Sequence, residues 1–168
     1  NILKKIFNDA KILGDPIRAV IHFAALKSVK DSILNPQKYF DNNVNGTINL
    51  IDIMNENNCR TIVFSSSASV YGELHDLPIN EDSKCIPTNP YGKTKFLIEN
   101  YLNKKFSDSM GEWRIICLRF FNPIGAHFSG KIGESSKEFA NNIFPIINNV
   151  AKKFQSELKI FGKNWPTK

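Results

Sequence analysis

The sequence predicts an α/β fold built on a doubly wound parallel sheet, Rossmann-like but incomplete. Three short runs of β-branched, aromatic and other apolar residues, at 19–25, 61–64 and 113–120, are typical of buried strands. Segments with apolar residues at helical spacing separate these runs. Strands and helices that alternate at these lengths indicate βαβ units with right-handed crossovers, and therefore a parallel sheet.

The first elements follow in order from the amino terminus. Apolar residues recur at helical steps over residues 2–13, and Gly14-Asp15-Pro16 ends that helix. The strand at 19–25 runs into small residues, which would let a flat ligand approach the backbone. Pro36 opens a second helix, whose apolar face continues to Met54.

The second half of the chain begins with the strand at 61–64, a long helix that starts near Tyr91, and the strand at 113–120. Beyond Gly125 the composition changes to glycine, serine, lysine and asparagine. We therefore predict two parts: residues 1–125 from a dinucleotide-binding domain, and residues 126–168 from the beginning of a smaller substrate-binding domain. In the second part we expect a short helix through residue 150 and a strand at 157–161.

Composition and charge narrow the classes of function. The 168 residues can form a real core, with 42% hydrophobic and 23% charged residues. The net charge of +6 comes from scattered lysines, so we expect no nucleic-acid partner. Three isolated cysteines and three dispersed histidines predict no metal site. No apolar run is long enough to cross a membrane, so we expect no membrane partner. The three cysteines are isolated and odd in number, which indicates reduced thiols and a cytoplasmic protein.

The segment that carries the chemistry combines strand-end serines with a tyrosine and a lysine. Tyr91 and Lys95 stand four residues apart in a predicted helix, so their side chains project from one face. A free phenol ionises near pH ~10, and a fixed cation beside it lowers that pKa. Ser67 closes a strand at the carboxyl edge of the sheet, where open α/β folds bind ligands. Its hydroxyl could pass a proton between a substrate hydroxyl and the phenol.

One feature of dinucleotide-binding folds is missing from these residues. Such folds open with a strand and a glycine-rich turn, which places the pyrophosphate at a helix amino terminus. This sequence contains no such turn, begins on a predicted helix and stops in a predicted loop. We therefore expect the chain to be an internal piece of a longer protein.

Several short motifs follow one another along almost the whole chain. They are His22-Phe23-Ala24-Ala25-Leu26-Lys27, Asp41-Asn42-Asn43-Val44-Asn45-Gly46-Thr47, residues 65–72, residues 89–95, residues 118–127, Gly133-Glu134 with Asn141-Asn142, and Ile160-Phe161-Gly162. In this order they resemble the middle of the UDP-glucose 4-epimerase family, within the extended short-chain dehydrogenase/reductase superfamily, and together they are far more specific than any one of them alone.

The resemblance implies a role for each matching residue. Tyr91 would be the acid and base, Lys95 would tune it and hold the nicotinamide ribose, and Ser67 would bridge the sugar 4-hydroxyl to Tyr91. The implied NAD site consists of Phe23, Ala24, Ala25, Leu26, Lys27, Asn42, Ser65, Tyr91, Lys95 and Phe121. The implied UDP-sugar site consists of Lys27, Ser67, Tyr91, Asn122, Asn142, Lys159, Ile160 and Phe161.

The implied reaction is the interconversion of UDP-glucose and UDP-galactose, by reversible hydride transfer at sugar C4 through a 4-keto intermediate. Related dehydratases carry an acidic pair after the first catalytic hydroxyl, where this chain has Ala68-Ser69, so epimerisation is favoured over loss of water. The alternatives are epimerisation of another UDP-sugar (a pentose, a uronate or an N-acetylhexosamine) and a non-catalytic remnant of the family. The resemblance also implies a homodimer that pairs the helices at 36–57 and 91–106.

Overall fold

The computed structural model describes residues 2–73, 77–133, 142–160 and 162. The chain forms two compact units, Asn1–Phe121 and Asn122–Lys168. The boundary falls at the end of the third strand, and each unit is described by itself.

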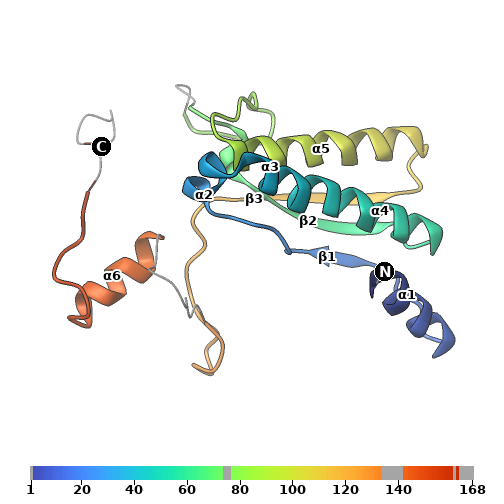
Figure 1. Cartoon of the computed structure of the whole chain (residues 1–168), viewed down its shortest axis with the longest axis horizontal. Helices are drawn as coiled ribbons and strands as arrows, with labels where there is room; N and C mark the ends of the chain where they lie inside the picture. Colours follow the sequence, from blue (N-terminus) through green and yellow to red (C-terminus); the bar gives the residue numbers. More distant parts are fainter. Residues whose placement is uncertain (1, 74–76, 134–141, 161, 163–168) are drawn as a thin grey trace. The chain divides into compact units, whose positions relative to one another are not determined.

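A three-stranded parallel sheet is the centre of the first unit (Figure 1). Its strands are β1 (Val20–His22), β2 (Thr61–Ser67) and β3 (Arg114–Phe120), in the order β1-β2-β3. Val20 pairs with Ile62, and Thr61 pairs with Arg114, so all three carboxyl ends meet at one edge. The predicted α/β class with a parallel, incomplete Rossmann-like sheet is confirmed.

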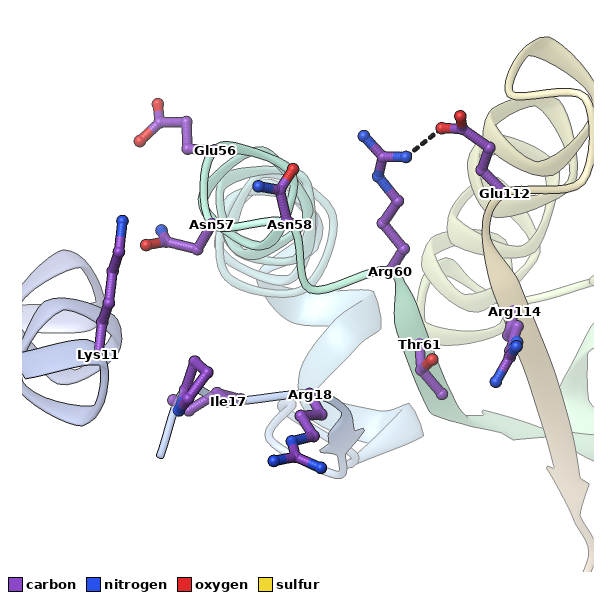
Figure 2. Close-up of a pocket in the computed structure, with 11 residues that line it drawn as sticks. Lys11, Ile17, Arg18, Glu56, Asn57, Asn58, Arg60, Thr61, Glu112 and Arg114 are labelled. Carbon is purple, nitrogen blue, oxygen red and sulfur yellow. Dashed lines mark hydrogen bonds and ion pairs between the residues drawn. The ribbon is translucent and has the colours of Figure 1, made fainter. Parts of the chain in front are cut away.

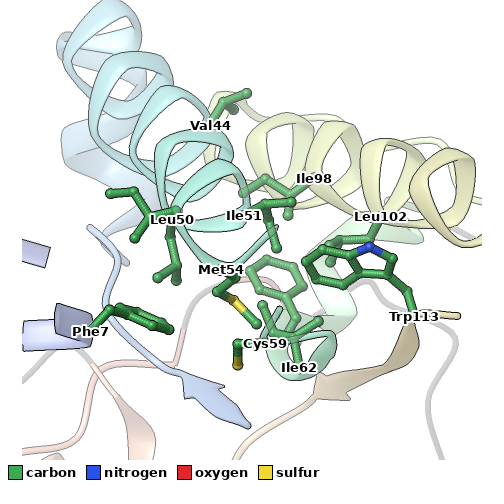
Figure 3. Packing of buried hydrophobic residues seen from close by; sticks show 12 residues of the cluster. Phe7, Val44, Leu50, Ile51, Met54, Cys59, Ile62, Ile98, Leu102 and Trp113 are labelled. Atoms are coloured by element: carbon green, nitrogen blue, oxygen red, sulfur yellow. The ribbon is translucent and has the colours of Figure 1, made fainter. Parts of the chain in front are cut away.

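Two long helices, α4 (Gly46–Glu56) and α5 (Pro90–Asp108), pack on one face of this sheet. Figure 3 shows Ile51 of α4, Ile98 of α5 and Ile62 of β2 in one cluster. Trp113 closes the cluster at the start of β3 and is 1% exposed. The apolar face of each helix is therefore used against the sheet, as its spacing predicted.

The opposite face of the sheet remains exposed within the first unit. Side chains alternate along a strand, so one face of β1 and β3 carries Ile21, Ile116 and Phe120, with Phe23 following β1. Ile21 is 65% exposed, Phe23 60% and Ile116 55%. Among the described residues, β1 also pairs on one side only. The core of this unit is thus one-sided.

The predicted helix at residues 2–13 is confirmed as α1 (Ile2–Ile12), which packs on α4 through Phe7. The predicted helix that Pro36 opens is interrupted. It consists of α3 (Pro36–Tyr39), a π-helical segment η1 (Phe40–Asn45) and then α4. A π-turn adds one residue per turn and shifts which side chains face inward, which a helical period cannot reveal.

Two further differences concern the ends of elements. A short helix, α2 (Val29–Leu34), precedes α3 and was not expected. Its signal is present in the sequence, because Ser28 caps it by accepting from the Asp31 amide at 3.1 Å. Strand β2 continues through the serines to Ser67, and Ala68–Val70 then form the 3-10 helix η2.

The second unit contains one described helix, α6 (Ile143–Ala151), as expected. The strand predicted at 157–161 is wrong for residues 157–160, which have no regular structure, and Phe161 lies outside the described residues. A strand needs a pairing partner, and none of the described residues supplies one there. Within the described part of the chain, no helix is long and apolar enough to cross a membrane.

Candidate active site

The start of α5 fixes the position of Tyr91. Asn89 caps the helix, its side-chain oxygen accepting from the Gly92 amide at 2.8 Å, and Pro90 occupies the first turn. The Ser32 hydroxyl of α2 accepts from the Tyr91 amide at 3.2 Å. The helix start therefore has a defined place against α2.

Gly92 sets the separation between α5 and the end of β2. A Cβ atom at this position would lie 2.5 Å from the Ser69 carbonyl oxygen and 3.2 Å from the Pro87 Cβ. A residue with a side chain would need the backbone to shift, so glycine permits the contact. This close approach brings Tyr91 beside the residues that follow β2.

Lys95 is buried one turn further along α5, with 3% of its surface exposed. Its Nζ donates to the Ser65 carbonyl oxygen at 2.7 Å, and lies 4.8 Å from the Phe64 ring centre and 5.8 Å from the Tyr91 ring centre. Burial lowers the pKa of Lys95 to about 8. The ammonium is thus held by the strand end and faces the phenol ring.

Ser67 and Tyr91 approach each other at the same edge. The Ser67 hydroxyl accepts from the Ser69 amide at 3.2 Å and also interacts with the Ser69 hydroxyl. Burial raises the pKa of Tyr91, while a side-chain hydrogen bond with Ser67 acts in the opposite direction. The sequence predicts that Lys95 lowers the pKa of Tyr91. The pKa is raised instead, because the cost of burying the charged phenolate exceeds the effect of the Ser67 hydrogen bond.

The loop after β1 is attached to the same region by Asn43 of the π-helical segment. The Asn43 side chain accepts from the Leu26 amide at 2.8 Å and donates to the Leu26 carbonyl at 3.0 Å. It also donates to the Thr94 hydroxyl at 3.3 Å, which in turn donates to the Tyr91 carbonyl at 2.7 Å. Asn43 therefore joins the loop that follows β1 to the first turn of α5.

The residue predicted from the sequence is the neighbour Asn42, which is exposed, whereas the inward-facing residue is Asn43, which is 1% exposed. The Asn43 amide has a donor and an acceptor on separate atoms, so it pairs with both the N–H and the C=O of Leu26. The sequence contains two adjacent asparagines, and helical spacing alone does not tell which one faces inward.

The first unit holds all of the catalytic residues and all of the cofactor residues proposed from the sequence. Those in the first unit lie in or after β1, at the carboxyl end of β2, in the π-helical segment, at the start of α5 and just after β3: Phe23, Ala24, Ala25, Leu26, Lys27, Asn42, Ser65, Ser67, Tyr91, Lys95 and Phe121. The Phe121 ring lies 6.3 Å from the Tyr71 ring and is 62% exposed.

The remaining proposed substrate residues belong to the second unit. Asn142 precedes α6 at its cap position and makes no capping hydrogen bond with its side chain. Asn122, Lys159 and Ile160 are exposed and lie outside regular structure. Phe161 falls outside the described residues. Their roles at a substrate stay predictions.

A separate hollow of about 500 Å³ lies at the opposite edge of the sheet, where the strands begin (Figure 2). Lys11, Arg18, Arg60 and Arg114 line it, and Arg60 forms an ion pair with Glu112. It shares no residue with the proposed site, which lies where the strands end. The chemistry is therefore assigned to the carboxyl edge alone.

Proteins of similar sequence are UDP-sugar epimerases. The bifunctional UDP-glucose 4-epimerase and UDP-xylose 4-epimerase 1 of Pisum sativum is 46% identical over 166 residues, covering 99% of this chain and 46% of that protein. The UDP-glucose 4-epimerase of Dictyostelium discoideum is 46% identical over 151 residues, covering 90% of this chain and 44% of that protein. The chain thus spans about half the length of the curated relatives it matches.

Solved structures agree with this similarity. The UDP-glucose 4-epimerase from Stenotrophomonas maltophila, with bound NAD and formylated UDP-arabinopyranose, matches with a TM-score of 0.90 at 38% identity, over 98% of this chain and 47% of that one. The Bifidobacterium longum enzyme in complex with NAD⁺ and UDP matches with a TM-score of 0.87 at 37% identity, over 99% and 50%. The family match itself extends over residues 4–165. On this evidence the chain belongs to the NAD dependent epimerase/dehydratase family.

Proposed function

We propose that the protein containing this chain is a cytoplasmic, NAD-dependent UDP-glucose 4-epimerase. The observation that supports this most directly is the meeting of Ser67, Tyr91 and Lys95 at the carboxyl end of β2. A phenol, an ammonium and a hydroxyl at one point are a proton-transfer set for an alcohol substrate. The relatives named above supply the reaction class, because their names state UDP-glucose 4-epimerase.

The residues present fit NAD at this edge. The Lys95 ammonium has three N–H donors and gives one to the Ser65 carbonyl, so others can be directed at ribose hydroxyls. Ala24 and Ala25 keep the loop after β1 narrow for a flat ring, and Asn43 holds that loop through Leu26. When bound, NAD would accept a hydride from sugar C4 and return it, so no net oxidation occurs.

The chain's own residues would move the proton. The Tyr91 phenolate oxygen accepts the proton of the sugar 4-hydroxyl, with Ser67 bridging the two oxygens, and later returns it to the 4-keto oxygen. The Lys95 Nζ lies 5.8 Å from the Tyr91 ring centre, where its charge would favour the phenolate. We assign Asn122, Asn142 and residues 159–161 to the uridine diphosphate, together with Lys27 near the sugar.

A second substrate class has a specific observation in its favour. The Pisum sativum relative is named for both UDP-glucose and UDP-xylose epimerisation, at 46% identity over 99% of this chain. UDP-xylose lacks the hydroxymethyl group of glucose, so a site that accepts the hexose has room for the pentose. We propose UDP-xylose as the alternative substrate ahead of uronates and N-acetylhexosamines.

The quaternary structure belongs to the same proposal. We infer a homodimer in which α4 and α5 of each copy pair with those of the other. Leu97 and Phe106 of α5 are 43% and 49% exposed, which supports an apolar contact on the outer side of that helix.

The test uses the protein expressed from the whole reading frame that contains this chain. Wild-type protein is expected to convert UDP-glucose to UDP-galactose, and Tyr91→Phe to lower kcat by about 100-fold or more because it removes the acid and base. Tyr101→Phe is the matched control, since Tyr101 lies on the same helix and packs against the core. Absence of turnover by the wild type with any UDP-sugar would favour the non-catalytic remnant, and normal turnover by Tyr91→Phe would refute the assigned chemistry.

A further inference from the structure

Three polar side chains form a buried cluster directly behind the proposed site. Glu99 of α5 is 3% exposed and Ser66 of β2 is 2% exposed. The Ser66 hydroxyl donates to the Glu99 carboxylate. Arg119 of β3 donates to the same carboxylate from Nε at 3.1 Å and from Nη2 at 2.8 Å. A helix and two adjacent strands are thus joined through one carboxylate.

The cluster is placed by the sheet register. Ser66 and Arg119 are paired residues on neighbouring strands, so their side chains emerge on the same face, toward α5. Arg119 also donates from Nη1 to the Tyr71 hydroxyl and to the Glu81 carbonyl, each at 3.0 Å. The guanidinium therefore donates to Glu99 from one side and to Tyr71 and Glu81 from the other. Because these bonds hold the guanidinium in place, Glu99 has a fixed partner.

Ser66 lies between the two β2 residues that face the proposed chemistry. On one side of it, the Ser65 carbonyl accepts from Lys95 Nζ at 2.7 Å. On the other side, Ser67 interacts with the Tyr91 hydroxyl. Any movement of Ser66 along or away from α5 would move both neighbours together.

Tyr91, Lys95 and Glu99 stand at successive four-residue steps on α5, so they share one side of the helix. A lysine and a glutamate four residues apart on a helix commonly pair. Here Arg119 takes the carboxylate, and Lys95 donates to the Ser65 carbonyl. The arginine thus leaves the lysine charge free to act on Tyr91.

We propose that Glu99 is a positioning residue for the reaction, which holds the end of β2 through Ser66 so that Ser67 and the Ser65 carbonyl keep their places beside Tyr91 and Lys95. Glu99 touches none of the reacting groups itself. The inference rests on the proposed function, and it assigns a task to a buried ion pair that would otherwise only stabilise the fold.

The decisive variant is Ser66→Ala, because it removes the hydroxyl link and leaves the Glu99–Arg119 pair intact. In the protein expressed from the whole reading frame we expect kcat to fall by about 5- to 10-fold with KM for the UDP-sugar and bound NAD nearly unchanged, since misplacement affects the transition state more than binding. Ser66→Thr keeps a hydroxyl and should recover most of the loss. Ser107→Ala, an exposed hydroxyl later on α5, is the control.

A double-mutant cycle separates positioning from general stability. In the Glu99→Leu background, which has no acceptor for the Ser66 hydroxyl, Ser66→Ala should cause little further loss of kcat, because both changes break the same link. Additive losses of kcat, or a lowered Tm with kcat unchanged in every variant, would overturn the proposal. Should Ser66→Ala fail to fold, Ser66→Cys, whose thiol is only a weak donor, gives the same reading against wild type.

A second readout does not depend on turnover. Ultraviolet titration of Tyr91, taken as the difference between each protein and its Tyr91→Phe partner, should show a higher pKa in Ser66→Ala than in wild type, because the Ser67 hydrogen bond that lowers it is weakened. An unchanged Tyr91 titration would contradict the positioning role even in a protein without turnover. Absent turnover with the expected titration shift would instead count against the proposed function alone.

Discussion

At the scale of single residues, the proposed site depends on a lysine that is kept charged in an unfavourable place. Lys95 is buried among β2 and α5, and its contacts include one backbone carbonyl and the faces of two aromatic rings. Its pKa falls from 10.5 to about 8 because burial favours the neutral amine. The buried Lys95 charge therefore lowers the stability of the fold, and a catalytic role would explain why such a charge is present.

This shift predicts how stability and activity respond to pH. Between pH 8 and 10.5 the unfolded chain keeps Lys95 protonated and the folded protein does not, so the unfolded state binds more protons and stability rises with pH. Activity responds to both groups: the Lys95 cation is lost above about pH 8, while the Tyr91 phenolate, whose pKa is raised, forms increasingly at higher pH, so kcat/KM should rise up to about pH 8 and stop rising there. Urea unfolding and initial rates over this range check both trends.

Lys95→Met is the matched variant for this prediction. It keeps the length of the side chain and removes the buried charge, so we expect the free energy of unfolding at neutral pH to rise by about 1–3 kcal/mol while activity is lost. The rise of stability with pH should also be smaller than in wild type. An unfolding free energy that is lower in Lys95→Met at neutral pH would show that the ammonium stabilises the fold instead.

At the scale of secondary-structure elements, the spacing between α5 and β2 controls the site. Backbone meets backbone at Gly92 and at Ser69 of η2, just after β2, while the Ser66–Glu99 link and the Lys95–Ser65 bond join α5 to β2 itself. These contacts join the helix and the strand over three successive turns of α5. A substitution at Gly92 that moves the start of α5 should therefore also displace the Lys95 and Glu99 contacts.

Gly92→Ala tests this spacing directly. The new Cβ would lie 2.5 Å from a backbone oxygen that cannot rotate away, so we expect about 1–3 kcal/mol of destabilisation and a lowered kcat. Gly46→Ala in α4 is the control, because no atom lies within 4 Å of its added Cβ and its φ is helical. That change should stabilise the protein by about 0.5–1 kcal/mol. Thermal unfolding of the two variants measures both, and equal Tm values would contradict the argument.

The elements themselves were largely predictable, and their cross-links were not. Helical spacing and buried apolar runs located α1, α4, α5 and the three strands, because period and burial are properties of local sequence. Tyr91 and Lys95 were found for the same reason. Glu99, Arg119 and Asn43 were missed, since their partners are set by sheet register and by a π-turn, which depend on tertiary structure.

At the scale of the whole molecule, the described part of the first unit buries one face of its sheet. The exposed face carries Ile21, Ile116 and Phe120, and β1 is paired on one side only among the described residues. Contiguous apolar surface and an open strand edge favour association with other protein surfaces.

These features predict the behaviour of the 168-residue chain purified alone. We expect it to self-associate at micromolar concentration and to show no 4-epimerase turnover, because the exposed apolar sheet face and the open edge of β1 favour association. Ile116→Lys places a charge on that face and should reduce the associated fraction in light scattering, whereas Lys30→Ala, at an exposed position on α2, should not. A monodisperse monomer with measurable turnover would show that the chain is sufficient.

The contact at Gly92 has a consequence for how sequences of this kind can diverge. Its two participants are main-chain atoms, so the gap between the phenol-bearing helix and the hydroxyl-bearing strand is independent of most side chains around it. Nearby residues can therefore be substituted without changing the distance between the Tyr91 phenol and the Ser67 hydroxyl. Tolerance to change should accordingly be broad at most surrounding positions and abruptly absent at Gly92.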